Sequence, residues 1–209
     1  MTQHGIGKII RMGQLIDAES QHTVIVAIDH GLGGAVPGID NLEPALEKII
    51  GGKPDAIIMS MGVAKRFQHL FSGRGKPSII ITVDRRFGST LPGKSSRGEA
   101  YRLTVDVEDA LLIGASAVKM VMNYGREDID VHTDNAEAVA EVARQCDGWR
   151  VPFILEPVLW GSLVTEADRN NLDILKHICR MGFEAGADLL KINYIGDVPT
   201  FREVAQTCP

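Results

Sequence analysis

Cysteine, excess positive charge and long apolar runs are scarce in this sequence, and each scarcity argues against a class of protein. The three cysteines, Cys146, Cys179 and Cys208, are widely spaced and form no CxxC pair, so neither a disulfide framework nor a zinc site is indicated. No apolar run approaches the roughly 18 residues that a membrane span needs, and the N-terminus lacks the apolar segment of a signal peptide. We therefore expect a cytoplasmic protein without a membrane partner.

The charge balance argues against a nucleic-acid partner. The chain of 209 residues carries 22 lysines and arginines against 27 acidic residues, a net charge of -5, which supplies no broad positive field for a phosphate backbone. With 44% hydrophobic and 23% charged residues, it can bury one sizeable core. We expect a single domain over residues 1–209.

Short apolar runs alternate with amphipathic stretches, a pattern typical of β-α units around a parallel sheet. The expected strands are residues 23–29, 55–61, 78–84, 117–123, 152–158 and 188–194. The expected helices are residues 41–50, 63–71, 105–113, 135–146, 170–184 and 199–207. The stretch 85–104, rich in glycine, serine and basic residues, is predicted to be irregular.

Two α/β architectures use such units, and the glycines decide between them. The glycines of residues 30–38 do not make a clean GxGxxG before a helix, which argues against an open doubly wound sheet. A (β/α)8 barrel of the TIM type is therefore the predicted fold. Such a barrel closes with eight strands and about 250 residues, so with only six β-α units we expect an incomplete barrel.

Ionisable residues stand near the carboxyl ends of five predicted strands. They are Asp29, Asp84, Lys119, Glu156 and Lys191. Because these strand ends lie on one face of a barrel, we expect the five side chains to converge on one mouth. Lys191 is the most telling, since an ammonium in an apolar run expected to be buried on both faces is costly unless it is paired or used.

These residue types favour imine chemistry. A lysine that is partly desolvated near a second cation, here Lys119, has a lowered pKa, and its neutral amine attacks a carbonyl to form a Schiff base. Asp29, His30 and Glu156 are the candidate proton carriers. Structural explanations compete with this one: lysines at strand ends commonly form ion pairs, Lys119 with Glu156 for example, and Asp29 before His-Gly is also typical of a turn.

Four segments together resemble the class I aldolases of the DeoC/LacD/DhnA group, which are Schiff-base (β/α)8 barrels. The matching segments are Ala27–Gly31, Gly114–Lys119, Pro152–Pro157 and Gly186–Lys191, in the order in which the family has them. The resemblance implies that Lys191 forms the imine and that Asp29 with His30 is the acidic element of the first strand.

The same resemblance bears on Lys119 and Glu156, which look like the lysine and glutamate of the tagatose-bisphosphate aldolase branch. Archaeal-type fructose-bisphosphate aldolases and the related synthases instead place a tyrosine acid/base shortly after the fifth strand. Residues 157–161 contain no tyrosine. Glu156 is therefore the preferred acid/base, and Lys119 orients substrate or tunes Lys191.

The implied partner is a phosphorylated keto sugar, and we expect a homo-oligomer without a metal or cofactor. The candidate substrate-binding residues are His30, Asp84, Arg85, Asn193 and Trp160. The loop carrying Arg85, Arg86, Lys94 and Arg97 is a candidate for the substrate phosphate. Asp84 beside two arginines is also typical of a loop ion pair, and a packing role is equally open for Trp160.

The ending of the chain departs from the family. The sequence stops where a seventh strand would begin, so the glycine-rich phosphate loops of strands seven and eight are not in it. We therefore expect a truncated aldolase. Two alternatives remain open, namely a catalytically inactive fragment or pseudoenzyme and a transaldolase-like synthase that uses the same imine.

Overall fold

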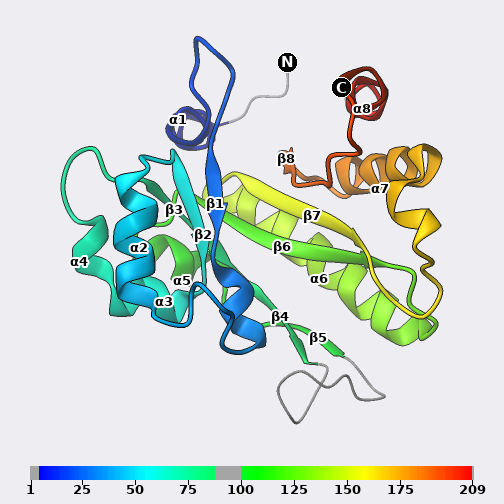
Figure 1. The fold of residues 1–209 in the computed structure, drawn as a ribbon, viewed down its shortest axis with the longest axis horizontal. Helices are drawn as coiled ribbons and strands as arrows, with labels where there is room; N and C mark the ends of the chain where they lie inside the picture. Colours follow the sequence, from blue (N-terminus) through cyan, green and yellow to red (C-terminus); the bar gives the residue numbers. More distant parts are fainter. Residues whose placement is uncertain (1–4, 88–99, 209) are drawn as a thin grey trace. The chain divides into compact units, whose positions relative to one another are not determined.

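The structure, a computed structural model, describes residues 5–87 and 100–208 (Figure 1). The chain forms two compact units, one made of Met1–Lys119 with Cys146–Pro152 and the other of Met120–Gln145 with Phe153–Pro209. Strand β6 (Ala117–Tyr124) and helix α6 (Ile129–Trp149) contribute residues to both. Within the described ranges, no helix is long and apolar enough to cross a membrane.

Six strands form a sheet in the order β1-β2-β3-β6-β7-β8. The remaining strands of this sheet are β1 (Ile25–Ala27), β2 (Ala56–Met59), β3 (Ser78–Thr82), β7 (Phe153–Leu159) and β8 (Leu189–Leu190). The pairings β1/β2, β2/β3, β3/β6 and β7/β8 are parallel. Neighbours in the sheet follow one another along the chain with helices between them, as in a TIM-type barrel, which confirms the predicted fold class.

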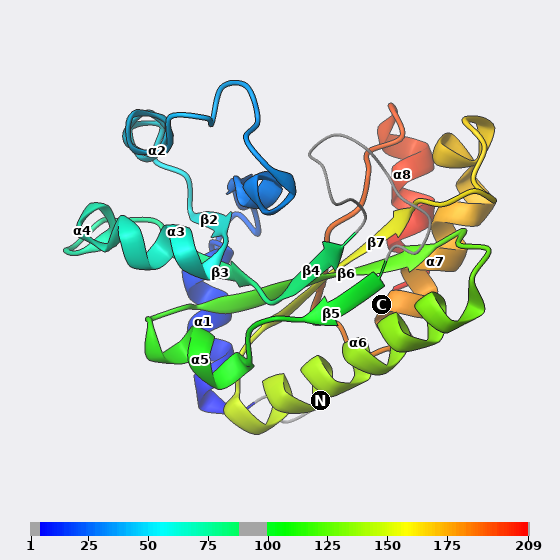
Figure 2. The same cartoon turned by 90° about the horizontal axis from the view of Figure 1, so that it is seen from below.

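Helices connect the strands. They are α1 (Ile6–Leu15), α2 (Leu42–Gly51), α3 (Met61–Arg66), α4 (Gln68–Phe71), α5 (Val107–Leu112), α6, α7 (Leu172–Glu184) and α8 (Val198–Ala205), with 3-10 turns η1 (Asp29–Gly33) and η2 (Ala167–Asn170). Side chains cap the N-termini of α7 and α8. Asn171 accepts hydrogen bonds from the amides of Asp173 and Ile174, and Asp197 accepts one from the amide of Thr200. Figure 2 shows α6 running alongside β6 and β7.

The prediction of an irregular stretch over residues 85–104 is wrong at both of its ends. Strands β4 (Asp84–Phe87) and β5 (Ala100–Leu103) pair as an antiparallel ribbon, with Asp84 opposite Leu103 and Phe87 opposite Ala100. The basic and glycine-rich composition concealed this ribbon because the two strands carry no run of apolar residues.

Other boundaries differ for identifiable reasons. The predicted last strand, 188–194, shortens to the two residues of β8, which is last in the order of the described strands and pairs there with β7. Helix 63–71 divides into α3 and α4 at Phe67, and helix α1 was not predicted. In α1 the apolar residues Ile6, Ile9 and Ile10 share one face but are exposed, while Leu15 is buried.

Buried strand residues form much of the core of each unit. In the first unit every residue of β2 is buried, as expected for a strand covered on both faces. In the second unit Phe153 and Leu155 of β7 are buried with Ile178 and Cys179 of α7. Gly182 lets α7 approach closely, because a Cβ there would lie 2.9 Å from Leu190 Cδ2 and 3.2 Å from Pro157 Cγ. This contact shows which face of β7 and β8 the helix covers.

Candidate active site

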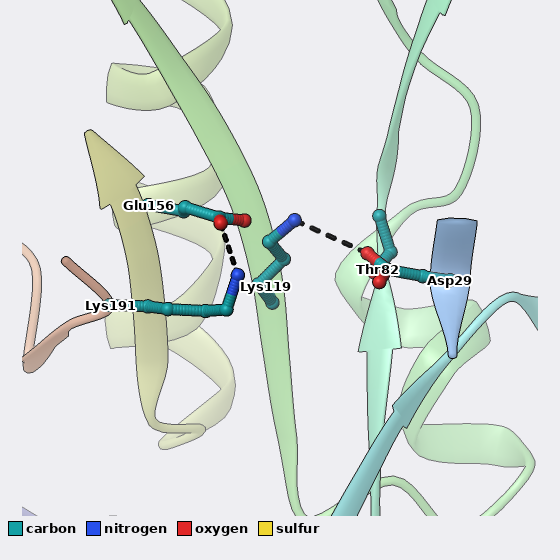
Figure 3. A network of polar contacts seen from close by, with 5 residues as sticks. All are labelled: Asp29, Thr82, Lys119, Glu156 and Lys191. Atoms are coloured by element: carbon teal, nitrogen blue, oxygen red, sulfur yellow. Dashed lines mark hydrogen bonds and ion pairs between the residues drawn. The ribbon is translucent and has the colours of Figure 1, made fainter. Parts of the chain in front are cut away.

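Lys119, Asp29 and Thr82 form a polar cluster in the first unit (Figure 3). Lys119 Nζ lies 3.2 Å from Asp29 Oδ2, and Thr82 Oγ1 donates a 2.7 Å hydrogen bond to the same oxygen. The register of β3 and β6 places Thr82 opposite Lys119, while Asp29 follows the end of β1. The strands thus bring to Asp29 two residues that are distant in the sequence, Thr82 at 53 positions and Lys119 at 90 positions.

The cluster is shielded from water and charged. The side chains of Lys119 and Asp29 are only 5% and 12% exposed. Burial pushes the pKa of Asp29 upward, but the Lys119 ammonium and the hydrogen bonds from Thr82 and Lys119 outweigh it, so the pKa lies below its ordinary value. Asp29 is therefore a carboxylate at neutral pH, held in one position by two donors.

Lys191 and Glu156 form an ion pair in the second unit, drawn in Figure 3. The backbone amide of Lys191 donates to Leu155 O at 2.9 Å, which continues the β7/β8 register by one residue and places Lys191 opposite Glu156. Leu155, Pro157 and Leu190 point toward α7. Because side chains alternate along a strand, Glu156 and Lys191 point to the opposite face.

The burial expected for Lys191 is not what the structure shows. Its side chain is 40% exposed and that of Glu156 is 18% exposed, and both residues of β8 are half-buried. The physical reason is that, among the strands that the structure describes, β8 pairs with β7 and with no strand on its other side. An exposed amine in direct contact with a carboxylate is accessible to a substrate and has a group beside it that accepts protons.

The predicted binding residues of the first unit occupy different environments. His30 is exposed within η1, next to Asp29. Asp84 is buried at the start of β4, and Arg85 after it is exposed. Arg86 lies in β4, and Lys94 and Arg97 lie outside the described residues. Their predicted contact with a phosphate stays a prediction.

In the second unit, Trp160 is half-buried at the end of β7, and the Arg126 guanidinium lies 6.0 Å from the centre of its ring. The chain is tightly packed here, because a Cβ on Gly161 would come within 2.0 Å of Gly125 O. Asn193 is exposed beyond β8. The structure thus brings Asp29 to Lys119 and Glu156 to Lys191, while the convergence of all predicted residues on one mouth remains a prediction.

Sequence reasoning missed Thr82 and a group of polar residues around the end of β6. Asn135 of α6 accepts a 2.9 Å hydrogen bond from Asn123 N and donates one of 3.0 Å to Val121 O. His132 Nδ1 lies 3.2 Å from Asn123 O. The only signal in the sequence was a polar residue inside an apolar run, as for Thr82 and Asn123. In the described part of the chain, no group of three or more His, Cys, Asp or Glu residues is placed to hold a metal ion.

The strand order and the lysine–carboxylate pairs at strand ends define a TIM-barrel-type α/β protein with a candidate imine-forming lysine. The chain belongs to the DeoC/LacD family of aldolases, whose family model matches residues 23–209.

Comparison with individual proteins agrees with this assignment. The chain is 31% identical over 202 residues to an uncharacterised aldolase of Saccharolobus solfataricus, a match that covers 95% of this chain and 72% of the relative. It is 27% identical over 206 residues to 2-amino-3,7-dideoxy-D-threo-hept-6-ulosonate synthase 1 of Archaeoglobus fulgidus, covering 97% and 70%. Its fold resembles a Schiff-base-forming fructose-1,6-bisphosphate aldolase, with a TM-score of 0.73, 22% identity and coverage of 96% and 76%.

Proposed function

We propose that this protein is a class I aldolase that cleaves or forms a carbon–carbon bond in a phosphorylated keto sugar through a Schiff base on Lys191. The observation that carries the proposal is the ion pair of Lys191 with Glu156, in which a lysine whose side chain is 40% exposed contacts a carboxylate. Membership of an aldolase family and similarity to a Schiff-base-forming aldolase fold support it.

The pair provides the first step of imine formation. Glu156 accepts a proton from the Lys191 ammonium, and the neutral amine attacks the ketone carbon. The new C–N bond forms as the π electrons of the carbonyl move to oxygen, and a proton then passes from the positively charged nitrogen to this oxygen to give the neutral carbinolamine. Glu156 then returns a proton as the carbinolamine loses water, leaving an iminium ion.

The iminium ion is the electron sink for the carbon–carbon step. A base removes the proton of the hydroxyl group on the carbon β to the iminium carbon, the bond between the α and β carbons breaks, and an aldehyde leaves. The bonding electrons remain as an enamine. Protonation of its carbon and hydrolysis of the imine release the second product and restore Lys191. The same steps in reverse join two carbon chains.

Asp29 and Lys119 are proposed as supporting groups, Asp29 as a second proton carrier and Lys119 as a residue that orients substrate or tunes Lys191. Substrate binding is proposed for His30, Asp84, Arg85, Asn193 and Trp160. A cytoplasmic homo-oligomer remains an expectation from the sequence.

Borohydride trapping tests the proposal. The protein is incubated separately with dihydroxyacetone phosphate, fructose 1,6-bisphosphate and tagatose 1,6-bisphosphate, reduced, and digested for mass spectrometry. We expect added mass on the peptide that contains Lys191 and none in Lys191→Arg. Lys176→Arg is the matched control, because Lys176 also pairs with a glutamate, Glu203, at 2.8 Å. An unmodified Lys191 peptide with all three compounds would favour the inactive-fragment alternative.

A synthase is the second candidate, favoured by the 27% identity to the Archaeoglobus fulgidus synthase. Both candidates form the same imine, so trapping does not separate them. To separate them, the protein that forms the imine is incubated with a labelled ketose phosphate and a panel of aldehydes. Release of a labelled aldehyde alone indicates cleavage, and a longer labelled product indicates synthesis.

A further inference from the structure

Asn123 carries a buried polar atom that has no partner among the described residues. The residue lies in β6 and is 1% exposed, and its side-chain oxygen Oδ1 receives no hydrogen bond within the described part of the chain. An unpaired acceptor shielded from water is costly, and such groups in folded proteins call for an explanation.

Hydrogen bonds hold the backbone of Asn123 in place, so a shift of the strand that would bring Oδ1 to a donor is opposed. Its amide donates to Asn135 Oδ1, and its carbonyl oxygen lies 3.2 Å from His132 Nδ1. On the other edge of β6, Trp160 N donates a 2.8 Å hydrogen bond to Tyr124 O. The Oδ1 atom is thus presented from a backbone fixed on both sides.

The hydrogen bond between Trp160 N and Tyr124 O also sets the register of β6 and β7. In a parallel pair it places Tyr124 opposite Leu159. Counting back along both strands, Asn123 lies opposite Val158, and Val121 lies opposite Glu156. Residues opposite each other in a parallel sheet point to the same face.

Glu156 on β7 lies opposite Val121 on one side and opposite Lys191, the residue after β8, on the other. Asn123 is two residues after Val121 on β6, so it shares a face of the sheet with Glu156 and Lys191. Asn123 lies two residues further toward the carboxyl ends of the strands, which is about 6–7 Å along β6. That offset corresponds to a few carbon atoms of a substrate attached at Lys191.

We propose that Asn123 Oδ1 accepts a hydrogen bond from a hydroxyl group of the keto sugar that forms the imine on Lys191, and that Asn123 thereby determines specificity for that hydroxyl. The inference rests on the proposed function and adds a substrate contact to it. An amide oxygen accepts a hydroxyl hydrogen but offers no attraction to a phosphate or carboxylate. Because Asn123 lies about 6–7 Å further along the strand direction than the Lys191–Glu156 pair, its contact is with a hydroxyl of the sugar chain and not with the carbonyl carbon that reacts with Lys191. A site built to bind a hydroxyl discriminates strongly against an analogue that lacks it.

The test compares hydroxylated and deoxy substrates in matched variants. The rate of borohydride-trappable imine formation on Lys191 is measured with dihydroxyacetone phosphate, fructose 1,6-bisphosphate and analogues in which one hydroxyl at a time is replaced by hydrogen. Asn123→Leu preserves volume and removes the acceptor, Asn123→Ala is the second variant, and Asn170→Leu makes the same change at an exposed asparagine.

We expect the unmodified protein to lose about 10-fold or more in rate with one deoxy analogue, and Asn123→Leu to lose less than about 2-fold with that analogue. Asn170→Leu keeps the full discrimination. The melting temperature of Asn123→Leu is unchanged or higher, because the variant removes a buried unpaired acceptor, whereas a purely structural residue would lower it. If Asn123→Leu does not fold, the same comparison is made with Asn123→Ala.

The outcomes distinguish a failure of the proposed function from a failure of the proposed Asn123 contact. A protein that forms no imine with any ketose phosphate overturns the proposed function and this inference with it. A protein that forms the imine while its Asn123 variants keep the original discrimination between hydroxyl and deoxy compounds overturns the inference alone.

Discussion

Lys191 and Glu156 contact each other across neighbouring parallel strands, one residue beyond the last hydrogen-bonded pair of β7 and β8. Their contact places an accessible amine next to a carboxylate on the face of the sheet that α7 does not cover.

Glu156→Gln should slow imine formation on Lys191 by about 100-fold or more at pH 7, because the amide keeps the shape of the side chain but does not accept the proton from the lysine. Borohydride trapping with a ketose phosphate over time measures the rate. Glu203→Gln is the matched control, since it removes the carboxylate from an ion pair at an exposed site. Equal rates for Glu156→Gln and the unmodified protein would remove Glu156 from the mechanism.

Asp29→Asn should destabilise the protein by about 3–5 kcal/mol at pH 7, because it removes a carboxylate that pairs with the buried Lys119 ammonium. The lowered pKa of Asp29 sets the sign of the pH dependence. A lowered carboxyl pKa contributes stability above the ordinary value of 3.8, and this contribution is lost as the pH falls through the lowered value of the folded state.

The stability difference between the unmodified protein and Asp29→Asn should therefore be constant near neutral pH and shrink below about pH 4. Urea unfolding between pH 3 and 7 measures it. Glu137→Gln, at an exposed position of α6, serves as the control and should show little difference from the unmodified protein. A difference that grows on acidification would contradict the role of the Asp29 carboxylate.

Gly182→Ala should destabilise the second unit by about 1–3 kcal/mol, because the added methyl group would lie 2.9 Å from Leu190 Cδ2 and 3.2 Å from Pro157 Cγ, so the packing between α7 and these two residues must shift. Denaturant unfolding measures the change. Gly148→Ala is the matched control in α6, where an added Cβ has no neighbour within 4 Å among residues 5–87 and 100–208. This control should be neutral or stabilising by up to about 1 kcal/mol, since alanine is the better helix former. A similar loss in both variants would show that the packing against Leu190 is not the cause.

Cys179 should resist alkylation in the folded protein. Burial, with a smaller contribution from Cys208, raises the pKa of its thiol to about 12, so the reactive thiolate is nearly absent at pH 8. Iodoacetamide labelling followed by peptide mass spectrometry should modify Cys179 at least about 100-fold more slowly in buffer than in urea. Rapid labelling of Cys179 in the folded protein would contradict the burial of this side chain.

Much of the secondary structure was predictable, because strands covered on both faces are continuous apolar runs. The runs around β2, β3, β6 and β7 locate those strands to within about 2–4 residues. The ribbon of β4 and β5 was not predictable in this way, since it lacks such runs. Helix α1 was also missed, although the spacing of Ile6, Ile9 and Ile10 is that of a helix.

The candidate site was predictable in its residue types and not in its contacts. Lys119, Glu156 and Lys191 stood out as ionisable residues in apolar runs. Thr82 and Asn123 did not, because hydroxyl and amide side chains are ordinary near strand ends. Only their surroundings distinguish them: Thr82 donates to Asp29, and Asn123 Oδ1 is buried with no donor among the described residues.

The sequence by itself determined the order of the β-α units and the place of each charged residue along its strand, since both depend on local patterns of apolar and polar residues. Only the tertiary structure decided which charges meet. Lys119 contacts Asp29 and Lys191 contacts Glu156, and the second contact leaves the lysine more exposed than its apolar run suggested. The physical reason is that a contact between strands depends on register and on whether a strand lies at the edge of the sheet, and neither is encoded within a single run of residues.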